Sequence, residues 1–224
     1  MTTLTTSPST ERRGRAAASA GAIAVQFTRQ SWAGLRVVLG FTLLLGFAYP
    51  LAVTGVGQVA LRWQANGSLL TSAGGHATSP GADVIGSALI GQAADGPRWF
   101  HPRPSAAGKG YDTLASAGSN LGPNNPDLLA TVAERRRAVA AEEGVDPAAV
   151  PADALTASAS GLDPEISPAY ARLQVARIAA ARGLPVADVA ALVEANVQGR
   201  TLGVLGEPRV NVLRLNLALE RMGG

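Results

Sequence analysis

The residues that could carry chemistry are few and widely spaced along the chain. There are two histidines, His76 and His101, and no cysteine. A metal site needs several ligands at close spacing, and neither histidine has such a companion. Ser158 and Ser160 lie in a stretch without the Gly-x-Ser-x-Gly pattern of a hydrolase nucleophile. The sequence therefore favours surface or structural histidines and hydrogen-bonded serines over a metal centre or a hydrolytic site.

Three other patterns have a chemical interpretation and a structural one. Asp163 and Glu165 could share acid–base work, but Asp163 precedes a proline, which is typical of a turn. The glycine-rich residues 118–123 lack the lysine and the strand-to-helix setting of a phosphate loop. The arginine run 135–137 is typical of a solvated helix face, with contact to an acidic partner as the alternative. None of these patterns indicates an enzyme class.

The longest feature is an uncharged run of 25 residues, 37–61. About 20 apolar helical residues cross a hydrocarbon core of roughly 30 Å. Thirteen of the 25 are Val, Leu or Phe, and each favours insertion by about 0.3–0.6 kcal/mol. We therefore predict a transmembrane helix over residues 33–61. A cleaved signal peptide, whose apolar stretch is shorter, and a buried soluble helix, which is rarely apolar on every side, are the alternatives.

The same run contains residues that modify a helix. Pro50 removes one backbone hydrogen bond and should kink the helix. Four glycines leave places where a second helix could approach closely; they are Gly40, Gly46, Gly55 and Gly57. The run holds no Asp, Glu, Lys, Arg or His, so this helix alone is not an ion path.

Charge is distributed unevenly about this helix. Five arginines and one glutamate precede it, a net of +4, and the total of +3 leaves −1 for residues 62–224. Positive flanks stay cytoplasmic, so we expect the large domain on the extracytoplasmic side of the cell membrane. Residues 1–28 have few large apolar groups and should form a disordered cytoplasmic tail. The excess of basic residues therefore indicates the orientation of the chain in the membrane. The large domain has no cationic patch interleaved with aromatic residues, the pattern that would indicate nucleic-acid binding.

The remaining sequence predicts a mixed α/β domain with a small sheet over residues 83–224, after a Gly- and Ser-rich linker over residues 62–82. A strand should begin at Val84, and residues 98–100 could return beside it. Residues 101–125 form a long loop of the kind that is often functional. Helices are expected over residues 126–143, 168–183, 185–198 and, less clearly against an alternating strand pattern, 211–220.

Five strings in a fixed order carry a family resemblance. They are residues 86–92, then Phe100 with residues 103–106, then Tyr111 with residues 118–126, then 150–168, and finally 205–213. Behind a single N-terminal anchor, these strings closely resemble the C subunit of the Kdp potassium-transporting ATPase. The resemblance covers about residues 33–220.

The resemblance implies a non-catalytic accessory subunit of a P-type ATPase complex that takes up potassium at high affinity. Its partners would be a channel-like A subunit, an ATP-hydrolysing B subunit and a small F subunit, which together handle ATP and potassium. The family is described as an assembly factor or catalytic chaperone that raises the ATP affinity of the B subunit, hence its association with nucleotide binding. A domain outside the membrane meets no cytoplasmic ATP, so we expect an indirect effect. A membrane-anchored extracytoplasmic enzyme and a scaffold unrelated to transport are the competing interpretations.

Eleven residues of the large domain, all but one of them polar, are the candidates for partner contact or for holding the loops. Arg103 can bind a carboxylate through two hydrogen bonds. The alternative is that such side chains hold their own loops through bonds to the backbone. The candidates for either role are Gln92, Phe100, Arg103, Ser105, Asn120, Asn125, Ser158, Ser160, Asp163, Gln174 and Asn211.

Overall fold

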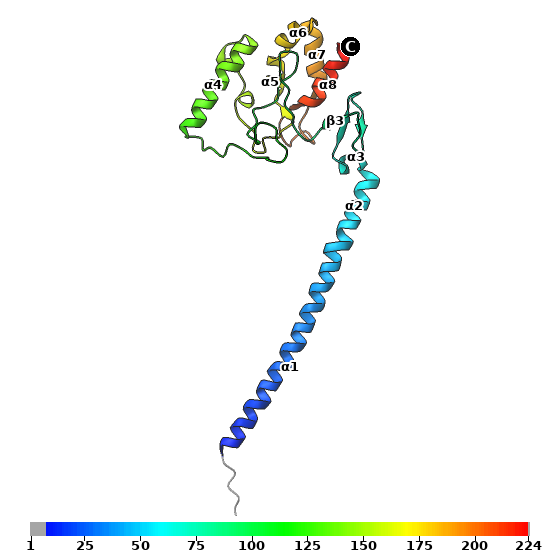
Figure 1. Ribbon diagram of the computed structural model, residues 1–224, viewed down its shortest axis with the longest axis vertical. Coiled ribbons are helices and arrows are strands. Elements are labelled where there is room, and N and C mark those ends of the chain that lie inside the picture. The colour runs from blue at the N-terminus through cyan, green and yellow to red at the C-terminus, as the bar shows by residue number, and fades with distance from the viewer. Residues whose placement is uncertain (1–7, 224) are drawn as a thin grey trace, which may run out of the picture. The chain divides into compact units, whose positions relative to one another are not determined.

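The computed structural model describes residues 8–223, with side chains from residue 22 onward. The chain divides into two compact units, Met1–Leu61 and Arg62–Gly224. Figure 1 shows the first unit as helix and the second as a mixture of helices and short strands. The first unit contains a long apolar helix, whereas the second is built around a buried core.

The first unit consists of α1 (Pro8–Leu43), a π-helical turn η1 (Leu44–Ala48) and α2 (Tyr49–Ala60). Its stretch Ala22–Ala60 contains an 18-residue window with a mean hydropathy of 2.0 and is long and apolar enough to cross a membrane. Its large apolar side chains are exposed to the surroundings rather than packed within the chain. This confirms the prediction of one N-terminal helix able to span a membrane.

The predicted disordered tail differs from the structure. Residues 8–28 are helical as part of α1, and residues 1–7 lie outside the described residues. The segment is rich in alanine, which has the highest helix propensity. Extending an existing helix is also much easier than nucleating a new one. The prediction of disorder rested only on the small amount of apolar surface that this segment could bury.

The predicted linker over residues 62–82 is wrong. It contains α3 (Arg62–Ala65), β1 (Leu69–Thr71) and β2 (His76–Ala77), and β1 pairs antiparallel with both β2 and β3 (Val84–Ser87) in the order β2-β1-β3. Trp63 stacks on His76 with ring centroids 3.9 Å apart, and Leu70 is only 2% exposed. Its glycines and serines serve the turns between strands.

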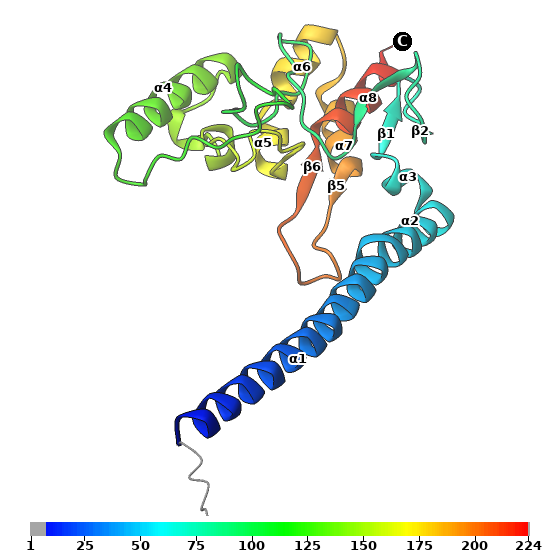
Figure 2. The same cartoon turned by 60° about the horizontal axis from the view of Figure 1, so that its bottom comes forward.

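A second small sheet has the order β4-β6-β5, all antiparallel, with β4 (Glu165–Ile166), β6 (Arg209–Asn211) and β5 (Val197–Gln198). Figure 2 shows β5 and β6 as the two arms of an extended hairpin. Residues 98–100, which could have formed a returning strand, lie outside both sheets. Their backbone is bound in another way, described below.

The helices of the Arg62–Gly224 unit pack with the second sheet around one core. They are α4 (Pro126–Glu143), the short 3-10 turns η2 (Pro147–Ala149) and η3 (Ala152–Ala154), α5 (Pro168–Leu173), α6 (Val175–Arg182), α7 (Val186–Asn196) and α8 (Val212–Met222). The largest buried apolar side chains are Phe100, Leu155, Ile178, Leu215 and Leu219. The predicted mixed α/β class with a small sheet is confirmed.

Local signals explain most of the helix boundaries. The Asn125 side chain caps α4, and Gly144 ends it in a left-handed conformation with φ of 66°. The predicted helix over residues 168–183 is two helices, α5 and α6, which meet at Gln174. The third helix ends at Asn196 rather than near residue 198, because the next two residues join the second sheet. The last segment is the helix α8, capped by Asn211.

Candidate functional site

The loop that carries Phe100 and His101 is held by two amide side chains. Asn216 Oδ1 accepts from the Phe100 N–H at 2.8 Å, and Asn216 Nδ2 donates to the Phe100 carbonyl at 2.9 Å. Gln174 binds His101 in the same way, accepting from its N–H at 2.7 Å and donating to its carbonyl at 3.1 Å. Side chains from α8 and from the α5–α6 junction thus replace the neighbouring strands that a sheet would supply.

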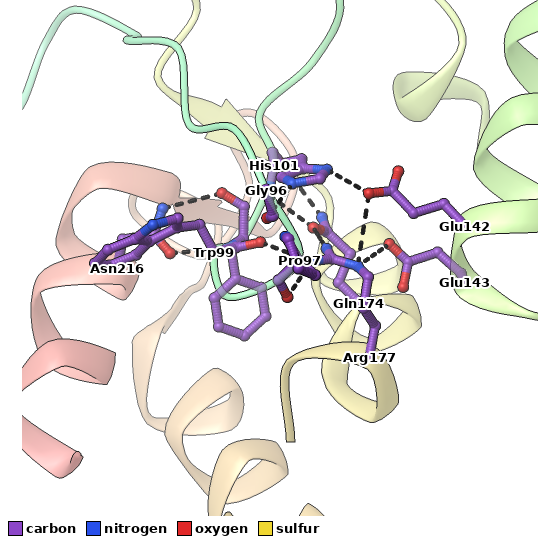
Figure 3. A network of polar contacts seen from close by, with 10 residues as sticks. Gly96, Pro97, Trp99, His101, Glu142, Glu143, Gln174, Arg177 and Asn216 are labelled. Carbon is purple, nitrogen blue, oxygen red and sulfur yellow. Dashed lines mark hydrogen bonds and ion pairs between the residues drawn. The ribbon is translucent and has the colours of Figure 1, made fainter. Parts of the chain in front are cut away.

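Arg177 ties this loop to two helices, as Figure 3 shows. Its NH1 donates to the Pro97 carbonyl at 2.7 Å and to the Trp99 carbonyl at 3.1 Å. Its NH2 donates to Gln174 Oε1 at 2.9 Å, and its Nε donates to Glu143 Oε1 at 2.9 Å. The Arg177 side chain is 7% exposed and the Glu143 side chain 1%. This is a buried ion pair with most of its hydrogen-bonding capacity used within the chain.

His101 lies at the edge of the same network. Its Nε2 is 2.9 Å from the Gly96 carbonyl, and its Nδ1 is 3.4 Å from Glu142 Oε1. Neither ring nitrogen contacts a serine hydroxyl, and the described residues contain no group of three or more metal-ligating side chains. His101 therefore has a structural environment in this loop.

Burial raises the pKa of Glu143, while the adjacent Arg177 guanidinium opposes that rise. The folded chain therefore binds a proton at Glu143 more readily than the unfolded chain. The favourable effect of this proton is present at and below the ordinary carboxyl pKa and is lost as pH rises through the raised value. Stability from this group should consequently fall with increasing pH.

Comparing the wild-type chain with Glu143→Gln tests this sign. Gln keeps a hydrogen-bond acceptor for Arg177 but does not titrate. We expect the wild type to lose stability relative to the variant as pH rises from about 4.5, measured by urea denaturation at several pH values. Parallel curves over that range would show that Glu143 has the same pKa in both states.

A second cluster holds the loop around Arg103. The Arg103 NH1 donates to Asp163 Oδ2 at 2.8 Å, and its NH2 donates to the Thr156 carbonyl at 3.3 Å. The Tyr111 hydroxyl donates to the Arg103 carbonyl. Burial and the nearby Asp163 charge both raise the pKa of Tyr111. Tyr111 therefore keeps its proton and acts as a donor at physiological pH.

Ser105 connects three parts of the chain at one hydroxyl. It donates to the Gly161 carbonyl at 2.7 Å and accepts from the Ala107 N–H at 3.1 Å and the Tyr111 N–H at 2.8 Å. Gly161 has φ of 66°, and a Cβ there would lie 2.6 Å from the Ala107 nitrogen. The two loops approach so closely that only glycine fits at this position.

The other predicted residues also lie mostly in loops and caps. Asn125 Oδ1 accepts from the Asp127 N–H, Asn211 Nδ2 donates to the Ala88 carbonyl, and Gln92 Nε2 donates to the Ile85 carbonyl. The Ser160 hydroxyl accepts from the Leu162 N–H and lies 3.4 Å from that of buried Ser158. Asn120 is exposed with φ of 53°. Phe100 is a core residue rather than a surface anchor.

The structure thus brings the predicted residues into two groups. Phe100 and Gln174 belong to the network around Arg177, whereas Arg103, Ser105 and Asp163 belong to the Tyr111 cluster. Asp163 Oδ1 also accepts from the Glu165 N–H at 3.0 Å, which fits the expected turn. Most of these side chains bind their own loops, and their contact with a partner stays a prediction.

A cavity of about 450 Å³ lies beside both groups. Its lining includes the cations of Arg103, Lys109 and Arg135 and the carboxylates of Asp95 and Glu142. The Arg103 guanidinium binds Asp163, and Arg135 NH1 donates to the Leu155 carbonyl at 3.0 Å. Because these two arginines already hold loops, the cavity has the character of a shaped surface hollow rather than a prepared anion site.

Sequence reasoning missed Asn216 and Arg177. Asn216 occupies the buried stripe of α8 together with Val212, Leu215 and Leu219. A polar residue at i+4 of an apolar helical stripe is a signal for a buried hydrogen bond. Arg177 had no comparable signal, because its partners lie on the 96–101 loop and at the end of α4.

Replacing Arg103 by Ala should destabilise the loops around residues 103–111 and 156–163. It leaves the partly buried Asp163 without its cation, which costs about 1–3 kcal/mol. Arg103→Lys keeps the charge but cannot donate in two directions from a planar group, so it should restore only part of the loss. The measurement is the urea midpoint of the Arg62–Gly224 unit.

The matched control is Arg172→Ala, which removes an ion pair to Glu194 whose side chains are both more than half exposed. That change should not shift the midpoint measurably. If Arg103→Ala behaved like the control, the Arg103–Asp163 pair would not contribute to holding the loops.

Comparisons with known proteins cover both units of the chain. Residues 31–221 match the family model described as "KdpC: K+-transporting ATPase, c chain". A potassium-transporting ATPase KdpC subunit of Caulobacter vibrioides is 58% identical over 181 residues, covering 80% of this chain and 87% of the relative. The protein of the same name from Beijerinckia indica is 55% identical over 180 residues, with the same coverage. That from Mycobacterium bovis is 53% identical over 196 residues, covering 87% of this chain and 99% of the relative.

Proposed function

The chain belongs to the KdpC family of potassium-transporting ATPase subunits, and from this membership we propose that it is a non-catalytic accessory subunit. In this role it assembles and stabilises the complex and acts as a catalytic chaperone that raises the ATP affinity of the ATP-hydrolysing subunit. The observation that carries the proposal is the extent of the family match, which includes the apolar helix and the whole loop-rich domain. The matched region therefore comprises both the anchor and the folded domain.

The arrangement of the loops supports a binding role over a catalytic one. The polar side chains of both clusters bind backbone groups of their own chain. Neither histidine contacts a serine in the described structure, because His101 contacts Gly96 and Glu142 and His76 stacks on Trp63. Nucleophilic catalysis needs a nucleophile within reach of a base. Rigid, internally bonded loops instead suit a surface whose shape a partner recognises.

The charge distribution supports an orientation. A net of +4 precedes the apolar helix and −1 follows it, so the N-terminus is cytoplasmic and the Arg62–Gly224 unit extracytoplasmic. The unit then cannot contact cytoplasmic ATP. Its effect on ATP affinity is indirect and passes through the membrane-embedded partners, because a ligand equilibrium shifts only by differential binding to two states of the complex.

The proposed partners are the channel-like A subunit, the ATP-hydrolysing B subunit and the small F subunit. The anchor packs beside the channel-like subunit, and the folded unit caps the extracytoplasmic ion entrance. Asn120, which is exposed, is the candidate for direct contact with a partner. Arg103, Ser105, Gln174 and Asn211 give the contacting loops their shape through internal hydrogen bonds.

Kinetics of the complex with and without this chain test the proposal. The complex is purified in mild detergent from cells with an intact or a deleted gene for the chain, and potassium-stimulated ATPase activity is measured against ATP concentration. We expect the complex without the chain to give a lower yield and a several-fold higher KM for ATP. Equal yield and equal KM would contradict both parts of the proposal.

A further inference from the structure

The π-helical turn before Pro50 deprives one backbone acceptor of its helical donors. The Tyr49 N–H donates to the Leu44 carbonyl, five residues back. In an α-helix the Leu45 carbonyl would accept from Tyr49, and in a π-helix it would accept from residue 50. Tyr49 is already used and Pro50 has no N–H. The Leu45 carbonyl therefore has neither of its helical donors.

The depth of this carbonyl in the membrane makes the missing donor costly. Leu45 lies eight residues inside the uncharged run 37–61, or about 12 Å at 1.5 Å per residue. The hydrocarbon core supplies no water, and an unsatisfied backbone group there costs several kcal/mol. Lipid tails have no hydrogen-bond donor. Only a protein side chain can satisfy this group without disturbing the bilayer.

The surroundings of the carbonyl leave room for such a side chain. Gly46 belongs to the same peptide unit, and the only contact that a Cβ there would meet is the Thr42 methyl group at 3.9 Å. Ala48, one of the side chains that follow along the helix, is small. The large apolar residues Leu44, Leu45 and Phe47 are all more than half exposed. A second helix can therefore come close to the π turn.

We propose that the π turn at Leu44–Ala48 is the intramembrane docking point for a transmembrane helix of another subunit of the ATPase, which donates a hydrogen bond from a hydroxyl or amide side chain to the Leu45 carbonyl. This inference rests on the proposed function for the existence of the complex. It adds the position and the chemistry of the contact. Pro50 then serves to expose an acceptor, because it removes the donor that would otherwise close the helix.

Site-specific cross-linking in intact membranes tests the position, and the chain has no cysteine of its own to interfere. Gly46→Cys and Gly40→Cys are each labelled with a thiol-reactive photo-cross-linker in the full-length chain within the complex. Gly40 lies six residues earlier, about 120° away on the helix. We expect an adduct with another ATPase subunit from position 46 and several-fold less from position 40. Equal labelling from both positions, adducts with lipid alone or an adduct with a second copy of this chain would overturn the proposal.

A substitution that restores the donor tests the chemistry. Pro50→Ala supplies the missing N–H, so the Leu45 carbonyl no longer needs the partner. We expect a several-fold lower recovery of ATPase subunits with the tagged variant, while Thr54→Ala, six residues and about 120° away from Ala48 on the helix, recovers them normally. If the Pro50→Ala chain remains in the membrane and recovers the other subunits fully, the docking inference is wrong although the proposed function stands. Failure of the wild-type chain to recover them would instead refute the proposed function.

Discussion

Gln174→Leu should lower the free energy of unfolding of the Arg62–Gly224 unit by about 3–5 kcal/mol, because each buried polar group left unpaired costs roughly 1–3 kcal/mol. The Gln174 side chain is fully buried. Its amide binds both backbone groups of His101 and accepts from Arg177, and Leu replaces none of these bonds. Domains of this kind are stable by only about 5–15 kcal/mol. The loss would therefore threaten folding at physiological temperature.

Urea denaturation followed by tryptophan fluorescence measures this effect, since Trp99 lies on the loop that Gln174 holds. The matched control is Gln64→Leu in α3, where the side chain is exposed. The control should change the free energy of unfolding by less than about 0.5 kcal/mol. A Gln174→Leu variant with the midpoint of the control would show that the bonds to His101 contribute nothing net to stability.

Arg177→Met should have an effect of similar size for a different reason. It leaves the buried carboxylate of Glu143 without its cation and removes the Arg177 donor from the Pro97 and Trp99 carbonyls and from Gln174 Oε1, which keeps the His101 N–H. Removing one member of a buried ion pair costs about 3–5 kcal/mol. We expect a correspondingly lower urea midpoint, with Arg172→Met, at an exposed ion pair, unchanged as the control.

A double-mutant cycle separates the charge from the other contacts of Arg177. The double variant Arg177→Met, Glu143→Leu leaves no buried charge without a partner. Its free energy of unfolding should therefore be higher than that of Arg177→Met alone. The remaining loss then reports the bonds to the Pro97 and Trp99 carbonyls. If the second substitution destabilised the protein further by its full single-variant amount, Glu143 and Arg177 would not act as a pair.

The features that sequence predicted well are those with a local cause. The cap at Asn125, the proline after it and the glycine after Glu143 fix both ends of α4 without reference to the rest of the fold. The apolar helix depends only on composition over residues 37–61. Asn211 was named as a cap for the same local reason, and the structure places it there.

The features that sequence missed depend on distant partners. The strands β1 and β2 have only three and two residues. They are stabilised by the pairing of β1 with β2 and β3 and by the Trp63–His76 stack. The segment at Phe100 and His101 is fixed by side chains 116 and 73 residues further along the chain. No local pattern distinguishes such a segment from a mobile loop.

For the candidate site too, the sequence indicated some of the residues that take part but not the distant groups that they bind. Arg103, Ser105 and Asp163 were chosen because they lie in matching loops, and all three prove to be bonded there. Several of their bonds could not be named from sequence, because backbone carbonyls take part in them. The Tyr111 hydroxyl donates to the Arg103 carbonyl, and the Ser105 hydroxyl donates to the Gly161 carbonyl. Backbone groups are the same at every residue, so sequence alone does not reveal which one a side chain reaches.

Purification of the intact complex is the most direct test of the central claim, that this chain is a membrane-anchored accessory subunit of a potassium-transporting ATPase. The full-length chain, tagged at its C-terminus, is extracted from native membranes in mild detergent and recovered with everything bound to it. We predict a stable assembly that contains a P-type ATPase subunit and a channel-like subunit and hydrolyses ATP in response to potassium. Recovery of the chain alone, with the ATPase active and intact in the unbound fraction, would contradict the account.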